Sequence, residues 1–502
     1  MKLLTAKQIR EWDQYTIHKE PITSIELMER AARACTKWLL QNTLADSYYI
    51  FCGKGNNGGD GLAIARMMAD AHHEARVFIL ESDAKGSLDF NINFTHLHQK
   101  GNVPITLLRS ENDFPVIPEN VIVIDALFGT GLNKTLEGNG AALVEYLNTL
   151  SNGIVSIDIP SGMFCDKSSA GNTVVSATHT LTFQVLKMAF LIAENENNFG
   201  QVHILDISLH PEYLENIQTK FQLINKTTCK SIHNPRNLFS HKGDFGHALL
   251  MAGSYGKMGA AVLSAKACMK SGAGLLTCHL PECGLYVMQT AVPEAMCIVD
   301  KESRVLSAIT DDISKYSAVG IGPGIGTHSE TSLLINSLIN NYSKPLVLDA
   351  DALNILSQNK EWLKMLPPYS ILTPHPKEFS RLFGEGMNDF EKIEMALLKA
   401  KELNVIILIK GHYSFIALPD GSGYFNITGN AGMATGGSGD VLTGILTGLM
   451  AQGYKPEEVV VFGVFLHGLA GDLASGKVSM EALVASDIIE NIGNAYLAIN
   501  QG

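Results

Sequence analysis

The sequence lacks the marks of several large classes of protein. Its eight cysteines form no CxxC pair and are too widely spaced along 502 residues for a disulfide scaffold, so we expect reduced thiols and a cytoplasmic protein. Basic residues are also in deficit, since 38 Lys and Arg stand against 50 Asp and Glu and give a net charge of −12. That balance excludes a general attraction to nucleic acid or anionic membranes, and we expect neither as a partner.

Long apolar runs are absent as well. The chain turns polar after Leu4, which is unlike the apolar core of a signal peptide. The most apolar long stretch, residues 459–474, is interrupted by glycines, His467 and Asp472, and this favours a buried helix over a membrane span. We therefore expect a soluble protein.

What is present is the composition of a globular protein. Apolar residues make up 46% of the chain and charged residues 18%, which argues against disorder. The length is about three times that of a typical domain, so we expect two or more domains.

Short β-branched or aromatic runs alternate with helical patterns along most of the chain, after an amphipathic stretch at 5–38 that predicts two helices. The candidate strands are residues 48–52, 76–80, 121–125, 154–158, 178–183 and 202–206, then 247–252, 275–280, 318–321, 346–349, 370–373, 405–410 and 414–418. This rhythm predicts an α/β fold with mostly parallel sheets. Residues 207–240 interrupt it, which indicates two doubly wound domains, 1–225 and 226–502.

The segment KGNNGGDG, residues 54–61, follows a candidate strand and leads into a helix that we expect to open near Asp60. Closely spaced glycines let backbone N–H groups approach an anion, and a helix N-terminus favours negative charge, so a phosphate or pyrophosphate fits. The order is not GxGxxG, and a tight turn with Asp60 as helix N-cap is an equal alternative.

Two further strand ends carry acidic residues. Asp125 precedes a glycine-rich turn, and Asp158 is followed by Ser161. Because ligands of open α/β sheets collect at the carboxyl ends of strands, these residues are expected to converge with Asn56, Asn57 and Asp60. Their hard oxygen atoms suit K⁺, Na⁺ or Mg²⁺, whereas capping of turns or helices is the alternative for each Asp.

The segment NAGMATGGSGD, residues 430–440, is the most specific in the chain. Three glycines lead into a helix that we expect to begin at Asp440, and the free N–H groups there would form an anion hole for a phosphoryl group in transit. Asp440 is placed to accept a proton from an attacking hydroxyl. A simple N-cap role for Asp440 is the less favoured alternative.

Three other polar residues carry open alternatives. His375 lies between two prolines after a strand, either as a cleft residue or as a rigid loop histidine without chemistry. Asp349 and Asp351 either help to hold Mg²⁺ through water, or Asp351 caps the next helix.

Several motifs of the first half together resemble a known family. KGNNGGDG, IDALFGTGL at 124–132, IDIPSG at 157–162 and LMERAA at 27–32 are similar to the N-terminal epimerase domain of bifunctional NAD(P)H-hydrate repair enzymes, over residues 1 to about 220. The resemblance implies a Rossmann-like three-layer sandwich, proton handling by Asp158 and K⁺ near Asn57, Asp125 and Ser161. It places the hydrated nucleotide at Asn56, Asn57, Gly58, Gly59, Asp60, Gly129, Thr130, Gly131, Leu132, Asn133, Lys134, Thr135 and Asp158.

The second half resembles the dehydratase of the same enzymes. The GxGD segment at 437–440 looks like that of ribokinase-like kinases, and GSYGKMGAA at 253–261, GIGPGIG at 320–326, LDADALN at 348–354, LTPHPKEF at 372–379 and IKGH at 409–412 match the ADP- or ATP-dependent NAD(P)HX dehydratase in order. The resemblance implies a ribokinase-like domain with Mg²⁺ and substrate contacts at Ala260, Gly324, His375 and Asp440. The implied adenine-nucleotide residues are Lys410, Gly411, His412, Tyr413, Ser414, Thr435, Gly436, Gly437, Ser438 and Gly439.

Together the two resemblances imply one enzyme with two activities. It would epimerise R- and S-NAD(P)HX and dehydrate the S form to NAD(P)H at the expense of ADP, giving AMP and phosphate. The expected partners are NADHX or NADPHX, ADP or ATP, and further copies of the chain in a homo-oligomer. Two alternatives are a ribokinase-like small-molecule or vitamin kinase with an N-terminal nucleotide-binding module, and a first domain that binds nucleotide or protein without turnover.

Overall fold

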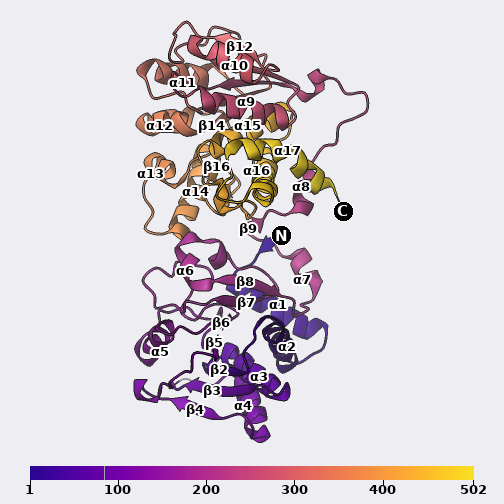
Figure 1. Cartoon of the computed structure of the whole chain (residues 1–502), viewed down its shortest axis with the longest axis vertical. Helices are drawn as coiled ribbons and strands as arrows, with labels where there is room; N and C mark the ends of the chain where they lie inside the picture. Colours follow the sequence, from indigo (N-terminus) through magenta and orange to yellow (C-terminus); the bar gives the residue numbers. More distant parts are fainter. Residues whose placement is uncertain (84, 502) are drawn as a thin grey trace. The chain divides into compact units, whose positions relative to one another are not determined.

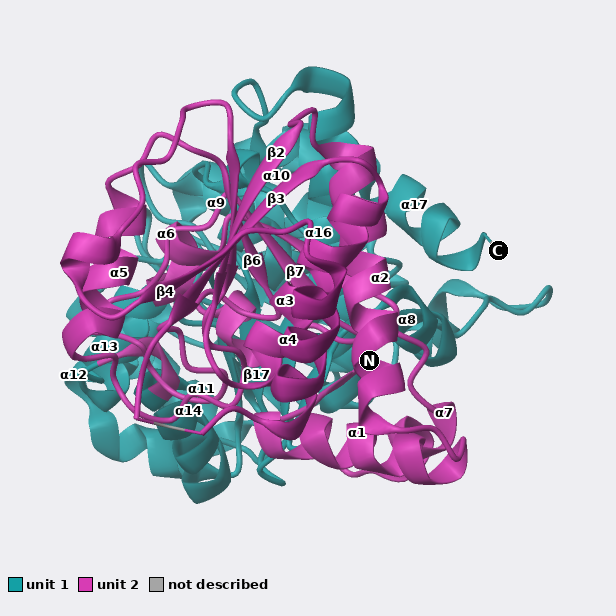
Figure 2. Ribbon diagram, turned by 90° about the horizontal axis from the view of Figure 1, so that it is seen from below, with its two compact units in different colours: residues 1, 220–387, 391–502 teal, residues 2–219, 388–390 magenta. Residues whose placement is uncertain are grey.

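The computed structural model describes residues 1–83 and 85–501. It divides into two compact units, which have different colours in Figure 2. The N-terminal unit comprises Lys2–Thr219 with Asn388–Phe390, and the C-terminal unit comprises Met1, Lys220–Met387 and the chain from Glu391 onward. The domain boundary at 225/226 stays a prediction.

The N-terminal unit is built on one parallel sheet with the strand order β4-β3-β2-β5-β6-β7-β8 (Figure 1). Its elements are β1 (Lys2–Leu3), α1 (Ala6–Lys19), α2 (Ser24–Asn42), β2 (Ser47–Cys52), α3 (Asn56–Asp70), β3 (Glu74–Leu80), α4 (Leu88–Lys100), β4 (Ile105–Leu108), β5 (Ile122–Ala126), α5 (Gly138–Asn148), β6 (Ile154–Ile157), β7 (His179–Phe183), α6 (Glu196–Phe199), β8 (Gln201–Leu205) and α7 (Pro211–Asn216). Helices α2, α3 and α4 pack into the core on one face of the sheet and α5 on the other, which makes three layers.

The C-terminal unit has a longer mixed sheet, with the strand order β9-β18-β17-β16-β15-β14-β13-β10-β11-β12. Its strands are β9 (Phe221–Leu223), β10 (His247–Met251), β11 (Leu275–Leu280), β12 (Met296–Val299), β13 (Ala318–Ile321), β14 (Leu346–Leu348), β15 (Ile371–Leu372), β16 (Ile406–Ile409), β17 (Ser414–Ala417) and β18 (Gly423–Asn426). Pairing is parallel except at β16–β17 and β17–β18, which form antiparallel hairpins.

Helices cover this second sheet. They are α8 (Lys226–Ile232), α9 (Met258–Lys270), α10 (Leu285–Ala291), α11 (Ser329–Asn341), α12 (Ala350–Gln358), α13 (Pro376–Phe383), α14 (Asp389–Leu403), α15 (Ser438–Ala451), α16 (Pro456–Val478) and α17 (Ala485–Asn500). The largest core cluster joins α9, α15, α16 and α17 to the central strands. Nearly all residues of β10, β13 and β14 are buried. Strands that are buried in this way consist of continuous apolar residues, as these three do in the sequence.

The predicted α/β class with two mostly parallel sheets is confirmed, as are two helices within residues 5–38. The expected buried helix is α16, the one described helix that meets the length and hydropathy criteria for a membrane span, with 72% of its apolar window buried inside the protein. All eight cysteines are free thiols.

Candidate active sites

The first site lies at the carboxyl ends of adjacent parallel strands, where the sequence predicted it. Asp125 is the fourth residue of β5, Asp158 directly follows β6, and α3 begins a few residues after β2. Because β2, β5 and β6 are neighbours in the sheet, their ends bring these residues together.

Asp125 is buried in a ring of hydrogen-bond donors. Its Oδ2 accepts from Ser156 Oγ at 2.7 Å and from the Ser161 N–H at 2.9 Å, and its Oδ1 accepts from Ser161 Oγ at 2.5 Å and from the Leu127 N–H at 3.2 Å. Burial raises the pKa of Asp125, and these donors oppose that rise. Asp125 and Ser161, two of the three predicted metal ligands, are therefore in direct contact.

Asn57, the third predicted metal ligand, is 7% exposed. Its Oδ1 and Nδ2 are both buried and lack a hydrogen-bond partner among residues 1–83 and 85–501. Since buried amide groups are normally paired, this orphaned pair of atoms points to a partner that the chain itself does not supply.

Asp158 is held by an ion pair and by an unusual backbone. Its Oδ1 lies 2.8 Å from the Nζ of Lys187, whose side chain is fully buried, and its Oδ2 accepts from the Thr130 N–H at 3.0 Å. Burial raises the pKa of Asp158, but the charge of Lys187 and the hydrogen bonds from Lys187 and Thr130 lower it by more, so the pKa lies below its usual value. The backbone φ of 70° places Asp158 in the left-handed region, where local strain is common at functional sites.

Two further carboxyl groups belong to this neighbourhood. Burial and the charge of Asp158 raise the pKa of Asp60 well above its usual value. Burial and Asp158 also raise the pKa of Asp13, on α1, to about 7, while Lys187 opposes the rise. No motif pointed to Asp13 or to the Asp158–Lys187 contact, because both depend on segments distant in sequence.

The glycines of KGNNGGDG lie at the start of α3, and their expected role in binding an anion stays a prediction. Helix α3 begins at Asn56 with Gly55 as N-cap, so the expected opening near Asp60 and the N-cap role of Asp60 are both wrong. A Cβ on Gly58 would lie 1.7 Å from the Gly53 carbonyl oxygen, and one on Gly61 would lie 2.7 Å from Cys52 Sγ. These glycines let α3 pack directly against the sheet, and the free N–H groups of its first turn remain at the strand ends.

The predicted loop at 129–135 begins beside Asp158, and the role of its other residues in binding stays a prediction. Gly129 and Thr130 adjoin Asp158, and a Cβ on Gly129 would also meet Asn57 at 3.3 Å. Leu132 packs against the core. The remaining members, Gly131, Asn133, Lys134 and Thr135, are exposed, as is Asn56 on α3.

The second site is built around the first turn of α15. This helix begins at Ser438, two residues earlier than expected, with Gly437 as N-cap at φ 93°. Asp440 lies inside that first turn, which corrects the expected helix start, and its main-chain oxygen accepts from Ser264 Oγ at 2.9 Å. Burial and Asp349 raise the pKa of Asp440 to about 6, against the opposing charge of Lys410.

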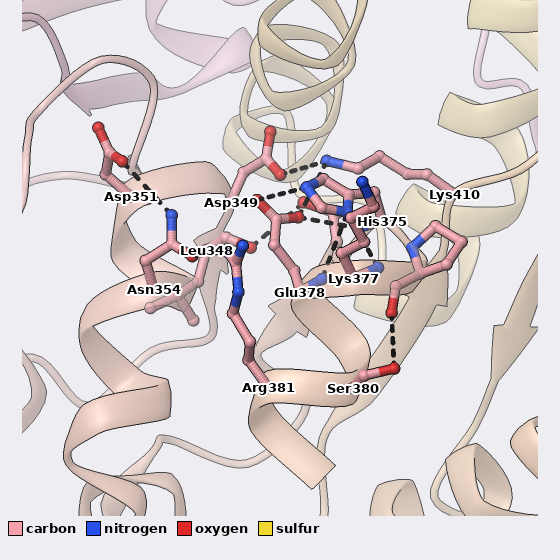
Figure 3. A network of polar contacts seen from close by, with 12 residues as sticks. Leu348, Asp349, Asp351, Asn354, His375, Lys377, Glu378, Ser380, Arg381 and Lys410 are labelled. Atoms are coloured by element: carbon pink, nitrogen blue, oxygen red, sulfur yellow. Dashed lines mark hydrogen bonds and ion pairs between the residues drawn. The ribbon is translucent and has the colours of Figure 1, made fainter. Parts of the chain in front are cut away.

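The Lys410 side chain reaches Asp349 at one side of the polar network in Figure 3. Its Nζ lies 2.6 Å from Asp349 Oδ1 and 4.0 Å from Glu378 Oε2. Asp349 Oδ2 also accepts from Thr443 Oγ1 at 2.7 Å, and a Cβ on Gly439 would lie 3.6 Å from Nζ. The strand end of β16, the N-terminus of α12 and the first turns of α15 therefore converge on one ammonium group.

His375 is tied into the start of α13. Its Nδ1 accepts from the N–H groups of Lys377 at 3.1 Å and Glu378 at 3.3 Å, and its Nε2 lies 3.4 Å from Glu378 Oε1 (Figure 3). This geometry fits the Nε2–H tautomer. Burial raises the pKa of Glu378, opposed by Lys410.

The N-cap of α12 is Asp349, so the expected cap role of Asp351 is wrong. Asp351 instead accepts from the Gly326 N–H at 2.9 Å.

Ala260 and Gly324, two predicted substrate residues, are neighbours. A Cβ on Gly324 would lie 3.1 Å from that of Ala260, and the Gly324 carbonyl accepts from Ser254 Oγ at 2.7 Å. Of the predicted nucleotide residues, Lys410, Ser438 and Gly439 are drawn together at the start of α15. Gly411 and His412 are exposed and Tyr413 is half-buried in the turn after β16, and Ser414 is the half-buried first residue of β17. Thr435, Gly436 and Gly437 lead into the helix.

Comparison with known proteins places the chain in a family. Residues 248–494 match the family model described as NAD(P)H-hydrate dehydratase, and residues 24–189 match YjeF-related protein N-terminus. The bifunctional NAD(P)H-hydrate repair enzyme Nnr of Moorella thermoacetica is 34% identical over 98% of this chain and 96% of its own length. The chain belongs to the family of bifunctional NAD(P)H-hydrate repair enzymes. The resemblance inferred from the motifs is thereby confirmed.

A solved structure supports the fold of the second unit. A ribokinase-like superfamily protein from Enterococcus faecalis is 26% identical, covers 57% of this chain and 99% of its own, and has a TM-score of 0.50. The ADP/ATP-dependent NAD(P)H-hydrate dehydratase of Bacillus subtilis, co-crystallised with ATP and Mg²⁺, is 30% identical, covers 55% of this chain and 98% of its own, and has a TM-score of 0.49. The ribokinase-like character expected for the second half is confirmed by the first of these.

Proposed function

We propose that the two sites perform the two steps of nicotinamide nucleotide repair: the first interconverts R- and S-NAD(P)HX, and the second dehydrates the S form at the expense of ADP. The observation that carries the proposal is the position of Asp440. It lies in the first turn of α15, directly after the glycine run, beside Asp349 and Lys410. A base, an anion-binding helix end and a cation thus occur together, as phosphoryl transfer requires.

The dehydration follows from the chemistry of the hydrated ring. The hydroxyl at ring carbon C6 is a poor leaving group, and phosphorylation converts it to a good one. Asp440 accepts the hydroxyl proton as the oxygen attacks the terminal phosphorus of ADP, and the bond to AMP breaks. The N–H groups of residues 437–439 and the Lys410 ammonium stabilise the phosphoryl group. Ring nitrogen N1 then expels phosphate, and loss of the C5 proton restores NAD(P)H.

The acidic residues around Lys410 fit the expected Mg²⁺. Asp349, Glu378 and Asp440 share one lysine, and Asp349 contributes to the raised pKa of each of the other two. No group of three His, Cys, Asp or Glu within the described ranges forms a metal cluster, so Asp349 would hold the ion through water. When bound on the nucleotide, Mg²⁺ would neutralise phosphate charge. The site also admits ATP as donor.

Epimerisation needs reversible loss of the C6 hydroxyl. Ring nitrogen N1 expels it to give an iminium ion, and water returns to either face. Asp158 stays ionised because its pKa lies below the usual value, so it accepts a proton from the returning water and passes it to the hydroxide that left, which becomes water. Lys187 positions this carboxylate from a fully buried side chain.

The oxygen atoms at Asn57 fit the expected K⁺. Asn57 Oδ1 is buried and unpartnered within residues 1–83 and 85–501, and Asp125 and Ser161 are the neighbouring hard donors at the strand ends. K⁺ held by these residues would fix the strand-end loops and would supply positive charge without itself reacting.

A recovery assay tests the proposal. Purified protein, mixed NADHX epimers and ADP should regenerate the near-ultraviolet absorbance of NADH completely, because exchange feeds the R form into the S form. Asp440→Asn should abolish recovery and leave epimer exchange intact, whereas Asp311→Asn, at an exposed carboxylate of the same unit, should change neither. Loss of both activities in Asp440→Asn would contradict two separate sites.

Product analysis separates this function from the alternatives. Free phosphate with restored NADH supports repair, whereas a stable phosphorylated product indicates a vitamin-type kinase. The family to which the chain belongs favours repair. An Asp158→Ala variant that exchanges epimers at the wild-type rate would instead support a first unit without turnover of its own.

A further inference from the structure

Helix α16 carries two polar residues that the proposed chemistry does not use. Thirteen residues of this apolar helix are buried, among them His467, which is 8% exposed. Asp472 lies five positions further on and is half-buried. Burying polar groups in such a helix is costly unless each has a partner, so their contacts indicate their purpose.

Both residues face the glycine segment, residues 428–438, that leads into α15. Asp472 holds its beginning: Oδ2 accepts from the Gly429 N–H and Oδ1 from Asn430 Nδ2, both at 2.9 Å. Thr428 Oγ1 donates to the main-chain oxygen of Phe465 at 3.1 Å. Asn430 Nδ2 also lies 3.2 Å from Ser475 Oγ, so four hydrogen bonds fasten the start of the segment to α16.

His467 holds the end of the segment. Its Nε2 lies 3.4 Å from the Oγ of Ser438, the first residue of α15. Burial, with a smaller contribution from the charge of Lys410, lowers the pKa of His467 to about 4, although the Ser438 main chain opposes the shift. The ring is therefore neutral at physiological pH and interacts as a hydrogen-bonding group rather than as a cation.

Two glycines of α16 allow this close approach. A Cβ on Gly468 would lie 2.3 Å from Thr428 Oγ1, and one on Gly471 would lie 2.2 Å from Met433 Sδ. The helix surface between His467 and Asp472 is thus shaped to the segment. Contacts at both ends and close packing between them leave the segment little freedom.

We propose that His467 and Asp472 are positioning residues for the phosphoryl donor: they hold the glycine segment against α16 so that the first-turn N–H groups of α15 point at the transferred phosphate. This inference rests on the proposed function of the second site. Neither residue needs to touch the nucleotide, because each acts through the segment. Misplacing a reacting group by about 1 Å costs about 100-fold in rate, so even a small relaxation should be visible.

The test compares variants of the full chain. His467→Leu should lower kcat for dehydration about 10- to 100-fold and weaken ADP binding in calorimetry, with the KM for NADHX and epimer exchange unchanged. His467→Gln, which keeps a hydrogen-bonding group, should recover most of the loss. Gly476→Ala is the matched control, because it lies on the same helix and a Cβ there meets nothing within 4 Å.

Asp472→Leu should resemble His467→Leu, since it frees the other end of the segment. If both Leu variants unfold at lower temperature but keep the wild-type kcat and ADP affinity, the role is structural only and the proposal is wrong. Failure of the wild-type protein to dehydrate NADHX would overturn the proposed function instead, and ADP affinity in calorimetry would still decide on His467 and Asp472.

Discussion

Replacing Asp440 by Asn should affect catalysis and stability in opposite directions. The pKa of this carboxyl is raised from 3.8 to about 6 by burial and by Asp349, against Lys410. Since the folded-state pKa exceeds the unfolded one, the folded state binds more protons, and the free energy of unfolding falls as the pH rises from about 4 to about 6. At neutral pH the ionised carboxylate costs at most about 3 kcal/mol, and about 1–2 kcal/mol after solvent screening.

The Asn variant removes both the base and this cost. Dehydration should fall about 100-fold or more, because a general base contributes that much. In calorimetry near pH 7.5, the unfolding transition of the C-terminal unit should rise by about 2–6 °C. Near pH 4 the gain should disappear, since Asp440 is then protonated in the folded wild-type protein.

The wild-type pH profile completes the test. Dehydration at low substrate concentration should fall about tenfold for each pH unit below the pKa of Asp440. If the Asn variant keeps its activity, or is less stable than the wild type at both pH values, then Asp440 is not a catalytic base with a raised pKa. Asp311→Asn again serves as the control, because that carboxylate is exposed.

Three further predictions concern the two glycine sites. Lys187→Met should abolish epimer exchange and destabilise the N-terminal unit by about 3–5 kcal/mol, because Asp158 loses its buried partner. Denaturant unfolding and epimer-exchange assays measure the two effects, and dehydration of S-NADHX should be retained. Gly437→Ala should weaken ADP binding in calorimetry, since φ is 93° and the new Cβ would lie 2.4 Å from Leu263 Cδ1; unchanged affinity would count against the observed turn. Replacing K⁺ by tetramethylammonium should slow epimer exchange and leave dehydration unchanged, and the Asn57→Leu variant should exchange epimers slowly in either salt. If the change of salt alters epimer exchange and dehydration equally, a K⁺ site at Asn57 is excluded.

Most buried strands were predictable, although the buried strand β18 was missed, and the starts of α3 and α15 were not predictable. The strands β2, β5 and β10 are buried on both faces, so their apolar runs mark them directly. β4 and β12 were missed because they lie at sheet edges and are partly exposed, which dilutes the apolar pattern. Glycine has low helix propensity, so a start at Asn56 within a glycine run is invisible locally and depends on packing against the sheet.

The candidate sites show the same division between local and distant information. Asp125 lies near the end of β5 and Ser161 shortly after β6, each within a short motif, so both could be predicted, and the sheet brings them together. The contacts of Lys187 with Asp158 and of Thr443 with Asp349 join different elements, and no local pattern indicates them. Which of the predicted residues bind the two nucleotides stays a prediction.

The left-handed backbone at Asp158 limits which residues evolution can place there. Besides glycine, Asp and Asn adopt that conformation most readily, because their short polar side chains tolerate it. Replacement by Glu would keep the charge and still disturb the chain direction between Ile157 and Ile159. Laboratory evolution of this site should therefore sample Asp, Asn and Gly at position 158, and chemistry alone then selects Asp among the three.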